Sequence, residues 1–518
     1  MSDPEDLMPI NLVHETLETN AAERGGKKYL TFGKDKFSYR EINSKAQKFA
    51  NLLHTRGFRK GDRICLMLEN SPEFFISFFG ILKAGCVCIP INTFFIREEV
   101  AYIINDSESK LFITSADFAE VADGISQKCP SLKTVMTYED TKFMSENIYK
   151  LLNKMTDTKM TIQITENDLA VFVYSSGTTG HPKGAMLTHK NMVANAYACL
   201  ERFHVTYNDV FLLFLPSFHS YALMTCVLLP TYVGSSIIIL GSVNDLKKKS
   251  FRNILLFQRP TFFLGVPQVY TALIRAKMPA WFIKFFYPIK LHVSGGAPLP
   301  EETLVKFREK FKHPIIEGYG LSEASPVVSA NRLDFQKPMS VGPALKGVEV
   351  KVVNENEVEL PVGEVGELIV KGPNIMKGYW NMPGLTDMTL RNGWLFTGDL
   401  AKLDEDGFIY IVDRKKDLII VKGINVYPRE IEEHLHKHPS VDAAAVIGLP
   451  DQKSGEIPVA YIKPKAGMSI SEKEIKGYLR QYLAHFKIPK QVQECQDMPM
   501  TATGKVLKRE LKRRVLGV

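Results

Sequence analysis

The first third of the chain alternates short apolar runs with stretches of helical periodicity. The apolar runs, which are bounded by polar or turn residues, predict three strands at residues 62–68, 87–91 and 110–114. Apolar residues at helical spacing predict three helices at residues 42–53, 73–82 and 98–105. Alternation of strands and helices of this kind predicts βαβ units and a mainly parallel sheet.

The same alternation returns after residue 168 and then gives way to two different patterns. The expected strands lie near residues 169–174, 236–240, 261–264, 290–294 and 315–316. Between residues 341 and 375, short apolar runs separated by proline and glycine predict a small β-barrel-like subdomain. From about residue 415 a new unit follows, with helices and strands at residues 428–436, 441–447, 459–464 and 470–483.

These patterns predict an α/β fold class with two unequal domains. The large N-terminal domain (residues 1–413) would contain two α/β subdomains and the β-barrel-like subdomain. The small α+β C-terminal domain would occupy residues 414–518.

A long uncharged stretch raises the question of a membrane span. Residues 211–244 contain no Asp, Glu, Lys or Arg, and this length exceeds that of a spanning helix. Proline, glycine, serine and histidine interrupt the stretch, and residues 236–240 form an isoleucine-rich run flanked by small residues. We therefore expect a buried helix followed by a buried strand.

Composition and charge narrow the class of protein further. The chain has 518 residues, of which 45% are hydrophobic and 24% charged, which excludes a disordered tail, a collagen-like fibre and a small disulfide scaffold. The formal net charge of +8 at pH 7 fits a binder of anionic small molecules and gives no support for nucleic acid. Seven scattered cysteines without a CxxC pair, and an acidic N-terminus without an apolar core, predict a cytoplasmic protein.

One segment combines the features of a phosphate-binding loop. Residues 174–184 read Tyr-Ser-Ser-Gly-Thr-Thr-Gly-His-Pro-Lys-Gly and follow an apolar strand. Glycines let backbone N–H groups approach an anion, hydroxyls donate further hydrogen bonds, and lysine adds a point charge. The pattern is not a Walker A motif, and a surface loop of this composition rarely follows a buried strand. We therefore expect phosphate contacts from Ser175, Ser176, Gly177, Thr178, Thr179, Gly180 and Lys183.

This segment closely resembles the signature loop of the adenylate-forming superfamily, which holds acyl-CoA synthetases, luciferases and the adenylation domains of peptide synthetases. Seven further stretches resemble motifs of that family, in the family's order, at residues 215–219, 265–270, 294–299, 317–323, 394–399, 413–417 and 499–505. The resemblance covers residues 10–515 and is strongest to bacterial medium- and long-chain fatty acyl-CoA synthetases. It implies that the small C-terminal domain is mobile and rotates between two half-reactions.

The resemblance implies roles for single residues around ATP and Mg²⁺. The loop would hold the β- and γ-phosphates, and Asp399 would bind the ribose hydroxyls. Ser322 would contact the α-phosphate, at a position where the family usually has Thr. Mg²⁺ would take its ligands from Glu323 and Ser175. Three residues would act in catalysis itself: Glu323, Lys183 and Lys505. Further ATP- or AMP-binding residues would be Gly296, Ala297, Pro298, Glu317, Gly318, Tyr319, Gly320 and Arg414, together with Lys183 and Lys505.

The resemblance also places the acid, the acceptor and the pivot. The acyl pocket would be lined by His219, Tyr221, Val266 and Gly296. Coenzyme A would pass Lys422 and Gly423, where a glycine leaves room for a thiol arm. The pivot between the two half-reactions would be Lys416.

Several of these residues also have a plainer structural interpretation. Taken alone, Asp399 fits a turn, Glu323 a helix start and Lys505 a solvated charge. The ordered set of motifs favours the functional interpretation for all three. His219 lies in an apolar stretch, where core packing and lining of the acyl pocket are equally expected.

Together these features predict an AMP-forming acyl-CoA synthetase, an acid–thiol ligase. A medium- or long-chain fatty acid would react with ATP to acyl-AMP and pyrophosphate, and the acyl group would pass to coenzyme A. The alternative substrate is an aryl acid, and the alternative acceptor is a free acyl carrier protein. A catalytically dead homologue that serves as a fatty-acid-uptake scaffold is disfavoured because Glu323 and Lys505 are present. We expect ATP, Mg²⁺ and coenzyme A as cofactors, and a monomer or homodimer.

One segment departs from the family pattern. Residues 279–290 read Pro-Ala-Trp-Phe-Ile-Lys-Phe-Phe-Tyr-Pro-Ile-Lys, where the family usually has a polar loop. A helix packed on the body is slightly favoured. The alternative is a peripheral contact with the inner membrane face or a fatty-acid entry point, because aromatics flanked by lysines suit a membrane interface.

Overall fold

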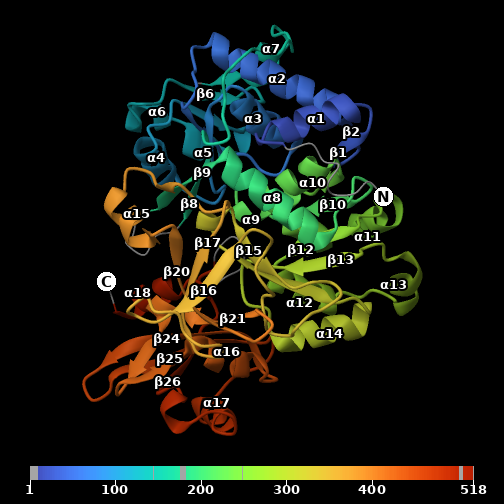
Figure 1. Ribbon diagram of the computed structural model, residues 1–518. Coiled ribbons are helices and arrows are strands. Elements are labelled where there is room, and N and C mark those ends of the chain that lie inside the picture. The colour runs from blue at the N-terminus through green and yellow to red at the C-terminus, as the bar shows by residue number, and fades with distance from the viewer. Residues whose placement is uncertain (1–9, 144, 176–181, 248, 501–505, 517–518) are drawn as a thin grey trace.

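The computed structural model describes residues 10–143, 145–175, 182–247, 249–500 and 506–516 and places four sheets among them (Figure 1). The first eight-stranded sheet has the order β15-β14-β13-β12-β10-β11-β1-β2 and is parallel except at its two edges. Its strands are β1 (Lys28–Phe32), β2 (Asp35–Ser38), β10 (Val210–Leu213), β11 (Ser236–Ile239), β12 (Phe262–Gly265), β13 (Leu291–Ser294), β14 (Ile315–Gly320) and β15 (Val327–Ala330).

The second eight-stranded sheet has the order β18-β9-β8-β4-β3-β5-β6-β7. It is parallel from β8 to β7, whereas β9 pairs antiparallel with both β8 and β18. Its strands are β3 (Arg63–Leu66), β4 (Val87–Pro90), β5 (Leu111–Thr114), β6 (Thr134–Thr137), β7 (Glu146–Asn147), β8 (Leu169–Ser175), β9 (Lys183–Thr188) and β18 (Gly378–Tyr379). The predicted βαβ organisation with mainly parallel sheets is confirmed.

Helices cover both sheets, and one large core runs through them. Helix α3 has eleven of its twelve residues buried, as expected for a helix that is apolar on all sides. Helix α2 begins at a capping box formed by Ser38 and Glu41 and buries one face against α3. The helices of this body include α1 (Glu15–Glu23), α2 (Tyr39–Thr55), α3 (Pro72–Lys83), α4 (Arg97–Asp106), α5 (Ala119–Ala122), α6 (Ile125–Lys128), α7 (Ile148–Leu152), α8 (His189–Phe203), α9 (Ser220–Ala222), α10 (Leu229–Val233), α11 (Lys249–Asn253), α12 (Pro267–Arg275), α13 (Ala280–Phe286) and α14 (Glu301–Phe311).

Residues 211–240 of the uncharged stretch are almost all buried, as predicted. It forms β10, the short helix α9, a π-helical turn (Leu223–Leu228), α10 and β11. Among the described residues, no helix is both long enough and apolar enough to cross a bilayer. The π-helical turn is a detail that apolar periodicity alone did not predict.

The turn-rich region forms a five-stranded antiparallel sheet, in which β16, β17, β20 and β19 lie in that order and β21 pairs with β20. Its elements are β16 (Glu349–Val353), β17 (Gly366–Lys371), β19 (Leu390–Arg391), β20 (Trp394–Leu403), β21 (Ile409–Arg414) and the helix α15 (Pro383–Thr389). This sheet lies between the N-terminal body and the C-terminal unit (Figure 1).

The C-terminal unit has its own sheet and its own core clusters. It follows β21 after a short turn (Lys415–Asp417), which lies where the domain boundary is predicted. The boundary itself and the movement of this unit stay predictions. Its elements are β22 (Ile419–Val421), β23 (Ile424–Val426), α16 (Pro428–His436), β24 (Val441–Asp451), β25 (Gly455–Pro464), α17 (Glu472–Leu479), β26 (Gln491–Glu494) and α18 (Lys508–Leu516).

Candidate active site

A large cleft of about 2340 Å³ lies between the N-terminal body and the C-terminal unit. Ser175 and Asp399, which belong to different sheets, both line it. The other predicted residues on its walls are Lys183, His219, Tyr221, Gly296, Ala297, Pro298, Glu317, Gly318, Tyr319, Gly320, Ser322, Glu323, Arg414 and Lys416. The structure therefore brings most of the described candidates to one place.

A carboxylate is held rigidly on one wall of this cleft. Asp399 lies opposite Arg414 in the register of β20 and β21, and the Arg414 Nε lies 3.5 Å from Asp399 Oδ1. The Tyr319 hydroxyl, at the end of β14, donates to Asp399 Oδ2 at 2.6 Å. Burial and the neighbouring Asp399 charge raise the pKa of Tyr319, so this hydroxyl stays a donor. Each carboxylate oxygen has a further lone pair, which suits the acceptance of hydroxyl hydrogens.

A lysine and a glutamate contact the same tyrosine, one over its ring and the other at its hydroxyl. Lys183 is almost fully buried at the start of β9, and its ammonium lies 5.2 Å from the centre of the Tyr379 ring. The Tyr379 hydroxyl donates to Glu323 Oε1 at 2.8 Å. Tyr379 reaches this position because β18 pairs with β9, where it lies opposite Ala185. The cleft thus holds a cation suited to phosphate and a carboxylate suited to a hard metal ion.

His219 lies on the cleft wall at the start of α9, and both interpretations given for it, core packing and lining of the acyl pocket, stay predictions. It lines the cleft, and its Nδ1 accepts a hydrogen bond from the backbone N–H of Tyr221 at 3.2 Å, which caps α9. Burial lowers the pKa of His219 to about 4, so the ring is neutral at pH 7. Ser220 lies between His219 and Tyr221 in the chain. Its hydroxyl oxygen is 3.1 Å from the hydroxyl oxygen of Ser322.

A glycine pair forms the wall beside Tyr221. A Cβ on Gly295 would lie 3.0 Å from the Tyr221 ring, so only glycine allows this contact without a shift. Gly296 has φ +79°, a left-handed conformation that favours glycine, and a Cβ on it would contact Val266 at 3.7 Å. Val266 is buried behind this wall and does not line the cleft itself.

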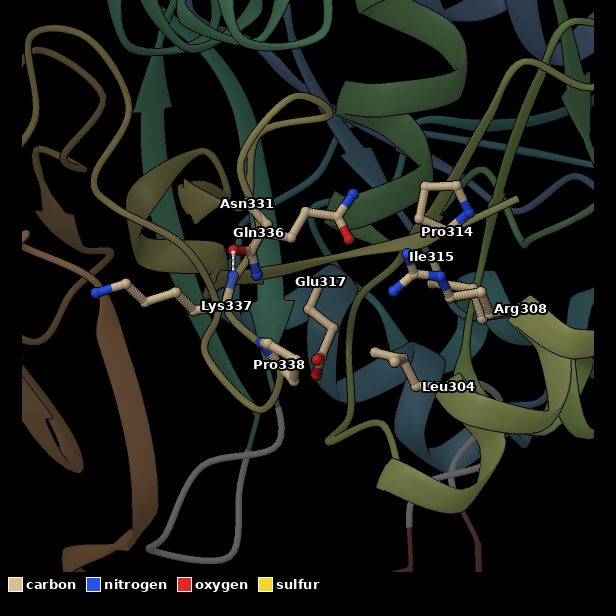
Figure 2. A pocket seen from close by; sticks show the side chains of 9 residues that line it. All are labelled: Leu304, Arg308, Pro314, Ile315, Glu317, Asn331, Gln336, Lys337 and Pro338. Atoms are coloured by element: carbon tan, nitrogen blue, oxygen red, sulfur yellow. Dashed lines mark hydrogen bonds between the residues drawn. The ribbon is translucent and has the colours of Figure 1, made fainter. Parts of the chain in front are cut away.

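Glu317 lies between the cleft and a small pocket behind β14 (Figure 2). In that pocket its carboxyl group points toward the space beside Pro338 and Leu304. Burial raises the pKa of Glu317 to about 7, and the Arg429 charge on α16 opposes this rise. The C-terminal unit therefore acts electrostatically on one of the predicted ATP- or AMP-binding residues.

The C-terminal unit turns one of its two surfaces toward the cleft. Residues 441–448 of β24, Met500 and residues 506–509 line it, and Met500 forms a β-bridge with Val506. Lys422 and Gly423 form the exposed turn between β22 and β23 and do not line the cleft. Both have positive φ values, +51° and +79°. The predicted coenzyme A path and the chain on either side of Lys505 therefore lie on different surfaces.

Two ion pairs join the two parts of the chain beside the cleft. Arg275 at the end of α12 lies 3.0 Å from Asp442 of the C-terminal unit. Lys437 of that unit lies 2.8 Å from Glu301 at the start of α14. All four side chains are at least 31% exposed, so each pair contributes little stability.

Some predicted residues lie outside the described part of the chain. They are Ser176, Gly177, Thr178, Thr179, Gly180 and Lys505. Their roles stay predictions, as do those of all the individual site residues.

Comparison with known proteins agrees with this geometry. The family model described as AMP-binding enzyme matches residues 17–380, and the model described as AMP-binding enzyme C-terminal domain matches residues 430–505. The chain belongs to the AMP-binding enzyme family.

Relatives of this AMP-binding enzyme extend over nearly its whole length. A long-chain-fatty-acid–CoA ligase of Bacillus subtilis (strain 168) is 34% identical over 98% of this chain and 95% of the ligase. A feruloyl-CoA synthase of Amycolatopsis sp is also 34% identical, over 92% of this chain and 94% of the synthase. The solved anthranilate CoA ligase AuaEII, in complex with anthranoyl-AMP, superposes with a TM-score of 0.90 at 27% identity and covers 100% of both chains.

These findings confirm the resemblance to the adenylate-forming superfamily and the predicted enzyme class, an AMP-forming acyl-CoA synthetase. Sequence reasoning missed Tyr379, which connects Lys183 with Glu323, and Thr397, whose hydroxyl accepts from the backbone N–H of Asp399 at 3.1 Å. Tyr379 follows a glycine in a stretch without apolar periodicity, and only its pairing with β9 shows its place.

Proposed function

We propose that this AMP-binding enzyme joins a medium- or long-chain fatty acid to coenzyme A through an acyl-adenylate. The observation that carries the proposal is the convergence of Lys183, Glu323 and Asp399 on one cleft that the C-terminal unit covers. In the first half-reaction a carboxylate oxygen of the acid forms a bond to the α-phosphorus of ATP, and the bond to pyrophosphate breaks. In the second, the thiol sulfur bonds to the acyl carbon, AMP leaves, and the thiol proton passes to solvent.

The residues around the cleft fit a role in charge neutralisation rather than acid–base catalysis. A carboxylate and a triphosphate repel each other, so their reaction depends on cations and on in-line positioning. Lys183 and Ser175, which lie opposite each other in the register of β8 and β9, would hold the phosphates. Asp399 would hold the ribose hydroxyls, and Lys505 would offset charge at the α-phosphate.

Mg²⁺ fits the cleft beside Glu323. A carboxylate that is fixed through one oxygen by the Tyr379 hydroxyl presents its other oxygen in a defined direction. We propose Glu323 as the protein ligand, with Ser175 as a second. The bound ion would neutralise phosphate charge.

The acid and the acceptor are tested by separating the half-reactions. ATP–pyrophosphate exchange without a thiol should depend on medium- or long-chain fatty acids and be much weaker with aryl or amino acids. Coenzyme A should then release the acyl group from acyl-AMP faster than a free acyl carrier protein does. Exchange that responds best to cinnamate- or benzoate-like acids would replace the fatty-acid assignment by the aryl-acid alternative.

We propose in addition that α13 contacts an anionic membrane surface. Phe282 and Ile283 are buried and fix the helix on the body, whereas Trp281 and Phe285 are 60% and 67% exposed. The Lys284 ammonium lies over the Phe285 ring. Exposed aromatics beside lysine suit the boundary between headgroups and acyl chains.

Vesicle flotation tests this contact. The native chain should float with vesicles that contain anionic lipid, and the Trp281→Ser, Phe285→Ser variant should float clearly less. A Val358→Ser, Val362→Ser variant is the matched control, because these two valines are also exposed but lie in the β16–β17 region. Equal flotation of all three chains would remove the membrane contact from the proposal.

A further inference from the structure

Helix α4 forms hydrogen bonds with β8 and with the residue directly before β9, on both sides of the predicted phosphate loop. The Tyr174 hydroxyl, one residue before the end of β8, donates to Asp106 Oδ2 at 2.6 Å. The Tyr102 hydroxyl donates to the carbonyl oxygen of Pro182, one residue before β9, at 3.3 Å. Tyr102 and Asp106 are four residues apart and therefore lie on the same side of α4. One helix face thus meets both ends of the β8–β9 connection.

The Tyr174 ring also lies over its cross-strand neighbour. Tyr174 and Gly184 are opposite each other in the β8–β9 register, and a Cβ on Gly184 would lie 3.0 Å from the ring. Glycine at this position lets the ring lie flat across the hairpin, so that its hydroxyl reaches Asp106. The next register pair is Ser175 with Lys183, both on the cleft wall.

Trp380 forms hydrogen bonds with both α4 and β9 of the hairpin. The Trp380 indole N–H donates to the backbone carbonyl oxygen of Asp106 at 2.9 Å, and the Trp380 backbone N–H donates to Gly184 O at 2.9 Å. Trp380 directly follows Tyr379, whose hydroxyl holds Glu323. Asp106 is therefore connected through hydrogen bonds to Tyr174 and to the segment that places Tyr379.

We propose that Asp106 is a positioning residue that fixes the hairpin end bearing Ser175 and Lys183, and so sets the affinity for the ATP polyphosphate. Asp106 does not line the cleft and acts through Tyr174. The inference rests on the proposed function, because it takes Ser175 and Lys183 as phosphate contacts. The bond carries a charge on its acceptor, and such bonds contribute more than neutral ones. The Asp106 carboxyl is only half-buried, and burial raises its pKa while the Tyr174 bond opposes the rise.

Direct binding measurements test the proposal without turnover. Tyr174→Phe and Asp106→Leu should each weaken ATP·Mg²⁺ binding roughly ten-fold in calorimetry without acid or thiol. AMP lacks the β- and γ-phosphates, so its affinity should stay within about two-fold. Asp106→Asn, which keeps an amide oxygen as acceptor, should retain most of the ATP affinity. Tyr138→Phe is the matched control, because its hydroxyl bonds to Ser77 in the core, 2.8 Å away, and its loss should leave ATP affinity unchanged.

The double variant separates one shared interaction from two independent ones. The chain that carries both Tyr174→Phe and Asp106→Leu should have the same ATP affinity as the single variant with the lower ATP affinity. Unchanged ATP affinity, equal losses for ATP and AMP, or additive losses in the double variant would each overturn the proposal. If Asp106→Leu fails to fold, the ATP-to-AMP ratio of Tyr174→Phe decides alone. Native chain that binds ATP without acid-dependent exchange would contradict the proposed function but not this inference.

Discussion

The two surfaces of the C-terminal unit differ in what they face and in how they are held. The surface formed by residues 441–448 and 506–509 lines the cleft and lies beside the ion pairs Arg275–Asp442 and Lys437–Glu301. The β22–β23 turn with Lys422 and Gly423 is exposed and lies away from the cleft. We propose that this arrangement suits adenylate formation, because the described chain on both sides of Lys505 lines the same cleft as Ser175 and Lys183. A different orientation would be needed to bring Gly423 to an acyl-adenylate, and the two exposed ion pairs contribute little to the stability of the present one.

The largest effect is expected from Lys505→Ala. Loss of one electrostatic group from a desolvated transition state typically costs roughly 10²–10³-fold in rate. Fatty-acid-dependent ATP–pyrophosphate exchange should fall by this factor. Thioester formation from supplied acyl-AMP should change far less. An equal loss of rate in both half-reactions would show that the two surfaces do not serve different half-reactions.

A pH-dependent effect is expected at Glu317, whose pKa also responds to the charge of Arg429 on α16. Its pKa of about 7 in the folded protein exceeds the ordinary 4.5, so the folded chain holds a proton that the unfolded chain releases. This contribution to stability is fully present below about pH 4.5 and is lost as the pH rises through 7, by up to about 3 kcal/mol. Glu317→Gln should therefore gain Tm relative to the native chain between pH 5 and pH 8, by a few degrees. Parallel pH profiles of Tm for the two chains would contradict the assignment.

A smaller effect is expected on the exposed surface. Gly423→Leu should slow thioester formation from acyl-AMP roughly ten-fold, because a side chain there obstructs the proposed thiol path, and should leave pyrophosphate exchange intact. Gly467→Leu is the matched control, since both glycines have φ near +79° and open space around the Cβ position. Both variants should lose similar stability through backbone strain. Equal rates for the two variants would remove Gly423 from the coenzyme A path.

The smallest effect is expected from the ion pairs. Asp442→Asn should weaken the observed orientation by less than about 1 kcal/mol, a rate change of a few-fold at most. It should lower the exchange rate slightly and raise the rate of thioester formation from acyl-AMP. A gain in exchange would reverse the proposed relation between orientation and chemistry.

Local patterns were enough to predict the framework, and most of the described candidate residues line one cleft, while their individual roles stay predictions. Apolar runs and helical periodicity located β3, β4, β5, β8 and β11 with α2, α3 and α4, because each element buries a face that its own residues define. Of the cleft-lining candidate residues, Ser175 ends β8 and Lys183 begins β9, whereas Asp399 lies within β20. The aromatic residues of 279–290 fall into two groups. Phe282 is buried in the body, as expected for a packed helix, whereas Trp281 is exposed, as a membrane contact would require.

What the sequence did not show depends on pairing between distant segments. Tyr379 reaches Lys183 only through the β18–β9 ladder, and Asp106 reaches Tyr174 only because α4 packs beside β8. Neither contact has a spacing that can be read along the chain. The raised pKa of Glu317 likewise follows from burial in the folded chain.

Restraining the C-terminal unit in its observed orientation tests the central claim most directly. Arg275→Cys and Asp442→Cys, joined by a short bismaleimide in a Cys495→Ser chain, would fix this orientation, because the other six cysteines are buried. The linked enzyme should keep fatty-acid-dependent ATP–pyrophosphate exchange within about two-fold of the unlinked enzyme and lose thioester formation. Unimpaired thioester formation by the linked enzyme, or loss of exchange together with it, would contradict the account.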